Sequence, residues 1–174
     1  MCILQNIEII NSFIQGFGIF WGVVAGTAVT LCSQWVMNKR AEKQKLKNIE
    51  IELIFMQQQI KSWLTSFSQY RNAINGDALE TWAEYIEVSK VLKTSLIESF
   101  TSGLIYRHFD NSLAADIQLA LTDFSIGMEQ VINHKISEQR ANFDKKKAIV
   151  DLNFFESKLK QHEKAVTKAL QCLR

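Results

Sequence analysis

The stretch that decides the fold is residues 46–74, LKNIEIELIFMQQQIKSWLTSFSQYRNAI. Its apolar residues alternate by three and four positions, which is the period of one face of an α-helix. This seam consists of Leu46, Ile49, Leu53, Met56, Ile60, Trp63, Phe67, Tyr70 and Ile74. Further apolar side chains widen the stripe, and a wide stripe suits a multi-helix bundle better than a two-stranded coiled coil. The stretch therefore predicts one long helix, over about residues 38–74, packed in a bundle.

Helix-breaking residues are scarce in the rest of the chain. Its 174 residues include no proline, so long helices are permitted. After Gly26 the remaining glycines are Gly76, Gly103 and Gly127, whereas a β-rich domain would need more turn residues. The composition therefore predicts an all-α protein.

Three further amphipathic helices are predicted at residues 78–106, at 113–139, and from a break near 142–144 to 173. The second and third are expected to turn inward Leu79, Trp82, Ile86, Leu92, Leu96, Phe100, Leu104, Ile117, Leu121, Phe124, Met128, Val131 and Ile132. The fourth has a seam of Leu152, Phe155, Leu159, His162, Val166, Ala169 and Leu173. Gly103 is expected to kink the second helix or end it early. Long amphipathic helices joined by short turns predict an antiparallel bundle of about four helices over residues 48–174.

Residues 9–37, IINSFIQGFGIFWGVVAGTAVTLCSQWVM, contain no charged side chain. At about 1.5 Å per residue they extend roughly 43 Å, which exceeds the ~30 Å hydrocarbon core of a bilayer. A secretory signal peptide needs a basic start, whereas residues 1–12 have no Lys or Arg. An interfacial helix needs a charged face, which this stretch lacks. The stretch therefore predicts a single transmembrane helix.

The charges that flank residues 9–37 predict its orientation. Residues 38–47 carry five basic residues and one acidic residue, and residues 1–8 carry only Glu8. The positive-inside rule then places residues 1–8 outside and the bundle in the cytoplasm, with the span in the inner (cytoplasmic) membrane. The expected contacts with anionic lipid are Lys39, Arg40, Lys43, Lys45 and Lys47. Residues 48–174 hold nearly equal numbers of basic and acidic residues, so a nucleic-acid partner is not predicted.

Small residues recur every four positions within residues 9–37, at Gly18, Gly22, Gly26 and Thr30. Such a row lies on one face of a helix and lets another helix approach closely in lipid. The row resembles the glycine zippers of some homo-oligomeric membrane channels, over about nine residues. It predicts a face for self-association or for a partner's transmembrane helix. The alternative is that glycine is simply common in membrane helices.

Motifs for chemistry are missing from the sequence. Nucleotide-binding, zinc-protease and hydrolase patterns do not occur. Cys2, Cys32 and Cys172 are too far apart to suggest a metal site or a disulfide framework. No catalytic residue, cofactor or metal ligand is therefore predicted, and the chain is not expected to be an enzyme.

Two functions remain in view. The first is a non-enzymatic, membrane-anchored helical interaction protein, which associates through its glycine face and presents its bundle to a cytoplasmic protein. The second is a pore-forming or membrane-disrupting effector with the bundle as sensor. In architecture the second resembles small membrane-anchored proteins of bacterial antiviral systems, which is an analogy of organisation alone.

Overall fold

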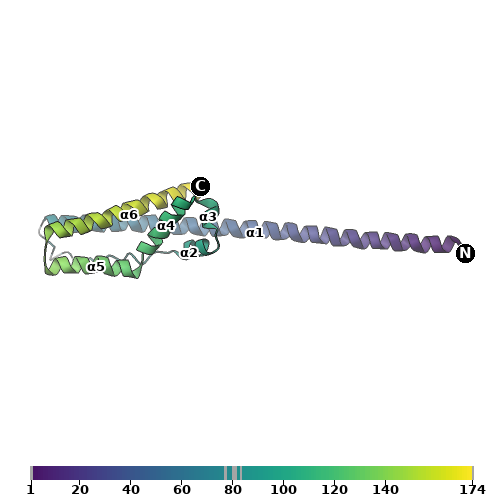
Figure 1. The fold of residues 1–174 in the computed structure, drawn as a ribbon, viewed down its shortest axis with the longest axis horizontal. Helices are drawn as coiled ribbons and strands as arrows, with labels where there is room; N and C mark the ends of the chain where they lie inside the picture. The colour runs from purple at the N-terminus through teal and green to yellow at the C-terminus, as the bar shows by residue number, and fades with distance from the viewer. Residues whose placement is uncertain (1, 77, 80–81, 83, 174) are drawn as a thin grey trace. The chain divides into compact units, whose positions relative to one another are not determined.

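The protein is described by a computed structural model, which covers residues 2–76, 78, 79, 82 and 84–173, with side chains from residue 21 onward (Figure 1). Every regular element in these residues is a helix, which confirms the all-α class. The helices are α1 (Cys2–Asn75), α2 (Thr94–Thr101), α3 (Ile105–His108), α4 (Asn111–Asp123), α5 (Ile126–Ala141) and α6 (Lys145–Leu173). The chain divides into two compact units, Met1–Lys45 and Leu46–Arg174. The second unit is the helical bundle.

In the described part of the chain, no helix is long and apolar enough to cross a membrane. The predicted span, residues 9–37, belongs to α1. The side chains of residues 9–20, including Gly18, fall outside the described part. The transmembrane helix therefore stays a prediction that this structure does not support.

The apolar seam predicted in residues 46–74 is the foundation of the bundle. From Ile49 to Ile74 all of its side chains are buried, and Leu46 at its start is half-buried. Each fully buried aliphatic or aromatic side chain stabilises the fold by about 1.5–3 kcal/mol. The predicted end of this helix near residue 74 is also confirmed, because α1 ends at Asn75. Within this unit, the other segments of the bundle cover the seam.

Helix α6 packs antiparallel to α1. Near the start of the bundle, the Gln57 side-chain amide donates to the Thr167 hydroxyl at 2.8 Å. Further along, Arg71 forms an ion pair with Glu156 at 3.0 Å. Residue numbers rise along α1 as they fall along α6, so the two helices run in opposite directions. The seam predicted for α6 is buried at all positions except Leu173, which is half-buried.

Helices α4 and α5 follow one another along α6 and form one interrupted arm (Figure 1). Asp110, the N-cap of α4, pairs with Lys168 at 3.1 Å. Glu138, near the end of α5, pairs with Lys147 at 2.6 Å. Both pairs follow the same antiparallel order against α6. The predicted antiparallel arrangement of this arm therefore holds.

The single helix predicted for residues 113–139 is wrong at one point, because it is interrupted at Phe124 and Ser125. Phe124 leaves the helical conformation, with φ −83° and ψ 60°. Its buried ring reaches Trp63, with 5.0 Å between the ring centroids. The Ser125 hydroxyl caps α5, and Lys93 Nζ donates to the Phe124 carbonyl at 2.6 Å. In an uninterrupted helix, the Phe124 ring would not reach this position. Its carbonyl would also be bonded within the helix and not to Lys93.

The second predicted helix, residues 78–106, is wrong over residues 84–93, which are not helical. This segment, the strap, runs back along α1 and leads into α2. Ile86 and Val88 are both 2% exposed. In a helix, residues two apart point in nearly opposite directions, whereas in an extended chain they share a face. Burial of both side chains therefore favours the extended form over the helical propensity of the sequence.

Two residues predicted to face inward are exposed instead, Leu92 and Val131. Leu92 lies in the strap, where the helical period does not apply. Val131 follows the interruption at Phe124, which resets the phase of α5 so that Ile132 and Ile136 are buried. Both errors have the same origin, because the helical period of the sequence does not continue across a break in the helix.

The first turn of helix α2 is bonded to a buried carboxylate. Glu52 of α1 is 4% exposed and accepts the backbone N–H groups of Ser95 and Leu96, each at 2.8 Å. It satisfies two N–H groups that the first turn of a helix leaves without partners. At its other end α2 stops at Thr101, and Gly103 turns the chain with φ +73°. The expected early end near Gly103 is confirmed.

We predict that Glu52→Leu destabilises the bundle by about 1–3 kcal/mol, because two buried N–H groups lose a charged acceptor. Urea unfolding of the full chain in mild detergent, followed by tryptophan fluorescence, measures the change. Gln58→Leu is the matched control, since Gln58 is exposed on the same helix. Equal stability of the two variants would show that the Glu52 cap contributes nothing.

Candidate functional site

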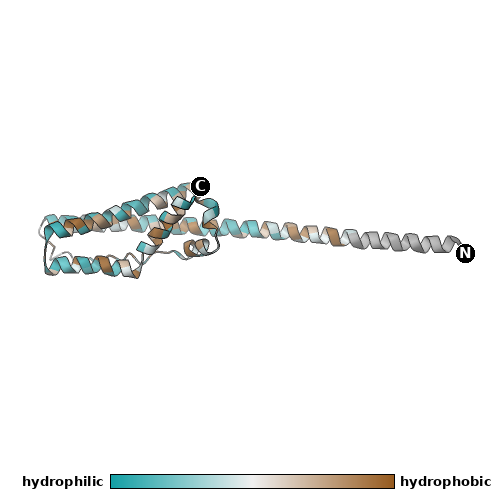
Figure 2. Ribbon diagram, in the orientation of Figure 1, coloured by the Kyte–Doolittle hydropathy of each residue, from teal (hydrophilic) through white to brown (hydrophobic). Residues whose placement is uncertain are grey.

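The first candidate site is the stretch of α1 from residue 21 to residue 37. All of its side chains are exposed, including Trp21 at 56% and Trp35 at 63%. Its large exposed apolar residues are Trp21, Val23, Val24, Val29, Leu31, Trp35, Val36 and Met37. At about 100° per residue these positions surround the helix. Figure 2 colours the stretch mainly brown and white, with teal following where charged residues begin.

The hydroxyl groups of this stretch bond to its own backbone. Thr27 donates to the Val23 carbonyl at 2.7 Å, and Thr30 donates to the Gly26 carbonyl at 2.8 Å. Ser33 donates to the Thr30 carbonyl at 2.8 Å. These bonds satisfy the hydroxyls inside the helix, as serine and threonine do in apolar surroundings. Apart from the exposed Gln34 side chain, the surface that the stretch presents is therefore largely apolar.

Gly22 and Gly26 are exposed on one face of this stretch. A Cβ atom added to either glycine would meet nothing within 4 Å, and neither has a left-handed φ. Each glycine lowers helix propensity by about 1 kcal/mol relative to alanine. Within the described residues, then, neither the backbone nor a neighbour requires glycine here. Thr30 continues the predicted face, and Gly18 lies outside the residues whose side chains are described.

A basic segment follows the apolar stretch on α1. Its five basic residues, Lys39, Arg40, Lys43, Lys45 and Lys47, are all exposed. At about 100° per residue, Lys39, Arg40 and Lys43 fall within an arc of about 100°. Each basic side chain near an anionic membrane surface adds about 1 kcal/mol of attraction. Lys47 falls within the same arc, whereas Lys45 lies on the other side of the helix. Four of the five basic residues therefore form a charged surface on one side of the helix.

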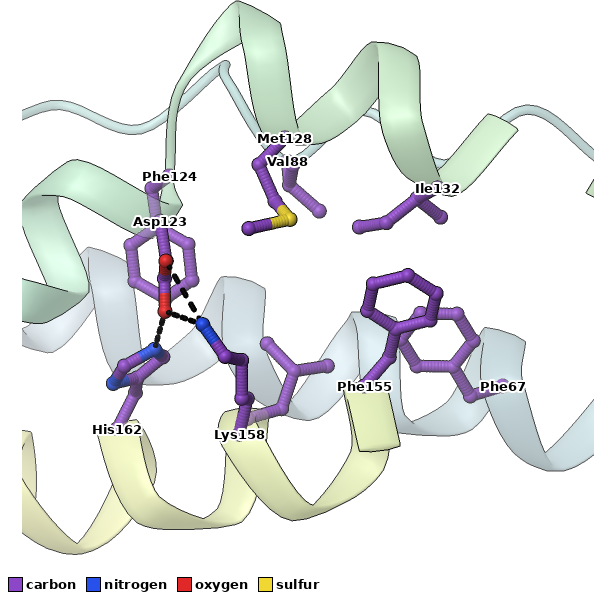
Figure 3. A pocket seen from close by; sticks show the side chains of 10 residues that line it. Phe67, Val88, Asp123, Phe124, Met128, Ile132, Phe155, Lys158 and His162 are labelled. Atoms are coloured by element: carbon purple, nitrogen blue, oxygen red, sulfur yellow. Dashed lines mark hydrogen bonds and ion pairs between the residues drawn. The ribbon is translucent and has the colours of Figure 1, made fainter. Parts of the chain in front are cut away.

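The second candidate site is a charged cluster inside the bundle (Figure 3). Asp123, the last residue of α4, extends toward α6 and accepts from His162 Nε2 at 2.9 Å and from Lys158 Nζ at 3.0 Å. His162 is 2% exposed. The edge of its ring meets the Phe124 ring, with 5.4 Å between centroids. The cluster joins α4 to α6 at the point where α4 ends.

Burial lowers the pKa of His162, because the charged imidazolium is poorly solvated there. The hydrogen bond to Asp123 and its negative charge act in the opposite direction, and nearby Lys158 adds to the lowering. The net pKa of His162 is below its ordinary value. At neutral pH the ring is therefore uncharged, and Nε2 carries the proton that it donates to Asp123.

A cavity of about 20 Å³ lies beside this cluster. Its apolar walls include Phe67, Val88, Met128, Ile132 and Phe155 (Figure 3). A space of this size holds about one water molecule, whereas small-molecule sites typically measure about 300–1,000 Å³. Within the described residues, no group of three His, Cys, Asp or Glu side chains could hold a metal ion. What the cluster provides in this structure is a hydrogen bond and an ion pair that connect α4 to α6.

The sequence placed His162 on a buried seam, and its burial is confirmed. It did not identify Asp123 as its partner, because the two residues lie 39 positions apart. The available signal was a polar residue in the middle of an apolar seam, which requires a partner from another segment. The glycine face and the basic residues lie on α1 as predicted, and their roles stay predictions.

Comparison of the chain with protein-family models, curated proteins and solved structures gives no match. The features that bear on function are therefore those of the chain's own residues. These are the exposed apolar stretch of α1, its glycine face and the basic segment that follows.

We predict that the bundle loses stability as the pH falls from about 7 to about 5.5. Below the ordinary histidine pKa of about 6.5, His162 binds a proton in the unfolded chain. In the folded chain it does so only at lower pH, because its pKa is lowered. The unfolded state then binds more protons, so stability falls as the pH falls and the loss levels off below the folded pKa.

The variant His162→Gln isolates this effect. A glutamine amide can still donate to Asp123 but does not titrate. Urea unfolding of both chains at several pH values should show a smaller decrease in unfolding free energy for the variant over this range. Parallel pH profiles would show that His162 titrates alike in the folded and unfolded chains.

Proposed function

We propose that this protein is a non-enzymatic, membrane-anchored interaction protein. In this proposal, residues 9–37 of α1 cross the inner membrane. Residues 1–8 then lie outside, and the bundle lies in the cytoplasm. The observation that supports it is the uncharged helix surface of residues 21–37, which carries large apolar side chains on all sides and is followed directly by a basic segment.

The apolar surface of residues 21–37 favours lipid over water. Soluble proteins rarely expose a contiguous apolar patch larger than a few hundred Å². A helix that is apolar on all sides is normally buried in a protein core or in a membrane. In the described residues of its own unit, this stretch is exposed throughout. Transfer of apolar surface out of water is favourable by about 25 cal/mol per Å².

The glycine face gives the proposed anchor a means of association. In lipid, helices attract mainly by close packing, and small residues allow their backbones to approach. Gly22 and Gly26 leave their backbone open on a surface that no described residue covers. The partner is a second copy of this helix or the transmembrane helix of another protein. The bundle, in turn, is available to a cytoplasmic protein.

We predict that the full chain resists alkaline extraction from bacterial membranes. Val24→Arg should release a large fraction of it, since arginine in the middle of a span costs about 2.5–3.5 kcal/mol. Val150→Arg is the matched control, because Val150 is exposed on the bundle. Immunoblots of the membrane and soluble fractions measure the distribution. Full release of the unaltered chain by alkali would refute the anchor.

We predict that Gly22→Leu shifts the solubilised chain toward monomer, because the side chain holds the two helix backbones apart. Ala28→Leu, a similar enlargement on the other side of the helix, should leave the oligomer in place. Light scattering of the nanodisc-embedded protein measures the mass. If both variants retain the wild-type mass, the glycine face does not mediate self-association, and a partner helix should be sought.

Expression in bacterial cells distinguishes the proposed function from a pore. An interaction protein leaves the membrane potential intact when it is expressed, whereas an open pore dissipates it. A potential-sensitive dye in cells that express the wild-type chain gives this readout.

A further inference from the structure

The strap is held in the bundle by side chains that bond to its backbone. The Asn133 amide accepts the Ile86 N–H at 3.0 Å and donates to the Ile86 carbonyl at 2.9 Å. The Glu129 carboxylate accepts the Ser89 N–H at 2.9 Å and the Tyr85 hydroxyl at 3.1 Å. Asn133 thus supplies the pair of bonds that a neighbouring β-strand would supply.

This clamp is part of α5. Glu129 and Asn133 are four residues apart, so they lie on the same face of the helix. Asn133 Nδ2 also donates to the Glu129 carbonyl of its own helix at 2.8 Å, which fixes the amide in place. Three of the four bonds to the strap involve its backbone N–H and C=O groups. The clamp therefore recognises mainly the extended backbone, and the buried side chains add the sequence preference.

Side chains of the strap alternate between the core and solvent. Ile86 and Val88 are buried, and Tyr85 and Glu87 are exposed. On the α1 side, the Ser66 hydroxyl donates to Glu84 at 2.7 Å. Backbone bonds together with sites for every second side chain are how proteins bind extended peptides.

The site for Val88 is not filled. Val88 borders the cavity of about 20 Å³ beside Met128 and Ile132 (Figure 3). The cavity lies on the α5 side of the strap and is backed by Phe67 of α1 and Phe155 of α6. This unfilled volume corresponds to about one methyl group, and filling such a void improves packing. A peptide with leucine in place of Val88 would fit this site better than the strap does.

The sequence of the strap is also compatible with a helix. Its sequence, EYIEVSKVLK, contains neither glycine nor proline and continues a helical pattern. A released strap can therefore form helix, which offsets part of the loss of its contacts. The extended form depends on the clamp and the core sites, which a competing peptide can occupy instead.

We propose that the groove between α1 and α5 is a peptide-binding site, which the strap occupies within the same chain. The partner replaces the strap with an extended segment that carries apolar residues at alternate positions, the second of them larger than valine. That this segment belongs to a cytoplasmic protein rests on the proposed function. Binding of the peptide itself does not depend on membrane insertion.

The test uses two fluorescent peptides, one with residues 84–93 and one with Val88→Leu, added to the full chain in mild detergent. Ile86→Ser in the chain loosens its own strap. We expect this variant to bind the peptides at least about tenfold more tightly than the wild-type chain does. The leucine peptide should bind more tightly than the valine peptide. Fluorescence anisotropy measures both affinities.

Adding Asn133→Ala to the Ile86→Ser chain should weaken peptide binding by about tenfold or more. Gln130→Ala, at an exposed position of α5, is the matched control. No binding to a loosened chain that keeps its helical circular dichroism would overturn the proposal, as would equal binding of the two peptides. These results do not depend on membrane extraction, so failure of the anchor would be recognised separately.

If Ile86→Ser fails to fold, hydrogen exchange of the wild-type chain tests the proposal instead. Exchange of the Ile86 and Ser89 amides at least about 100-fold faster than that of the buried α1 amides would show local release of the strap. Equal protection would show that the strap opens only when the bundle unfolds, and would overturn the proposal.

Discussion

The bundle depends on the burial of one apolar stripe of α1, from Ile49 to Ile74. Several other segments of the bundle pack against it. Helix α6 runs antiparallel along it, and the interruption after α4 brings Phe124 against Trp63. The strap runs back beside α1 and places the start of α2 at Glu52. Because these arms cover the stripe within one chain, it is not available for a coiled coil between chains.

Periodicity predicted the parts of the fold in which one helix keeps one phase. Helices α1 and α6 were recovered because their buried residues repeat every three or four positions without a break. It failed at the strap and at Phe124, where the deciding interactions come from distant residues. Asn133 lies 47 positions from Ile86, and Lys93 lies 31 positions from Phe124. A local pattern cannot report partners at such separations.

The candidate sites divide in the same way. The apolar stretch, the glycine spacing and the basic segment are properties of consecutive residues, so the sequence displays them directly. The structure adds that Gly22 and Gly26 are not required by any described neighbour. By contrast, the link between Asp123 and His162 and the clamp on the strap exist only after folding. They depend on pairs of residues from different arms.

Three of the buried polar residues in this bundle lie at, or bond to, a place where a helix begins or ends. Glu52 receives the start of α2, Asp123 ends α4, and Gln139 accepts the Asp144 N–H in the turn before α6. Buried polar groups are costly unless they are bonded, and helix ends carry backbone groups that need partners. The two requirements satisfy each other. Glu52 and Gln139 each accept a backbone N–H at a place where another segment begins a helix or turns. The apolar pattern alone does not reveal these places.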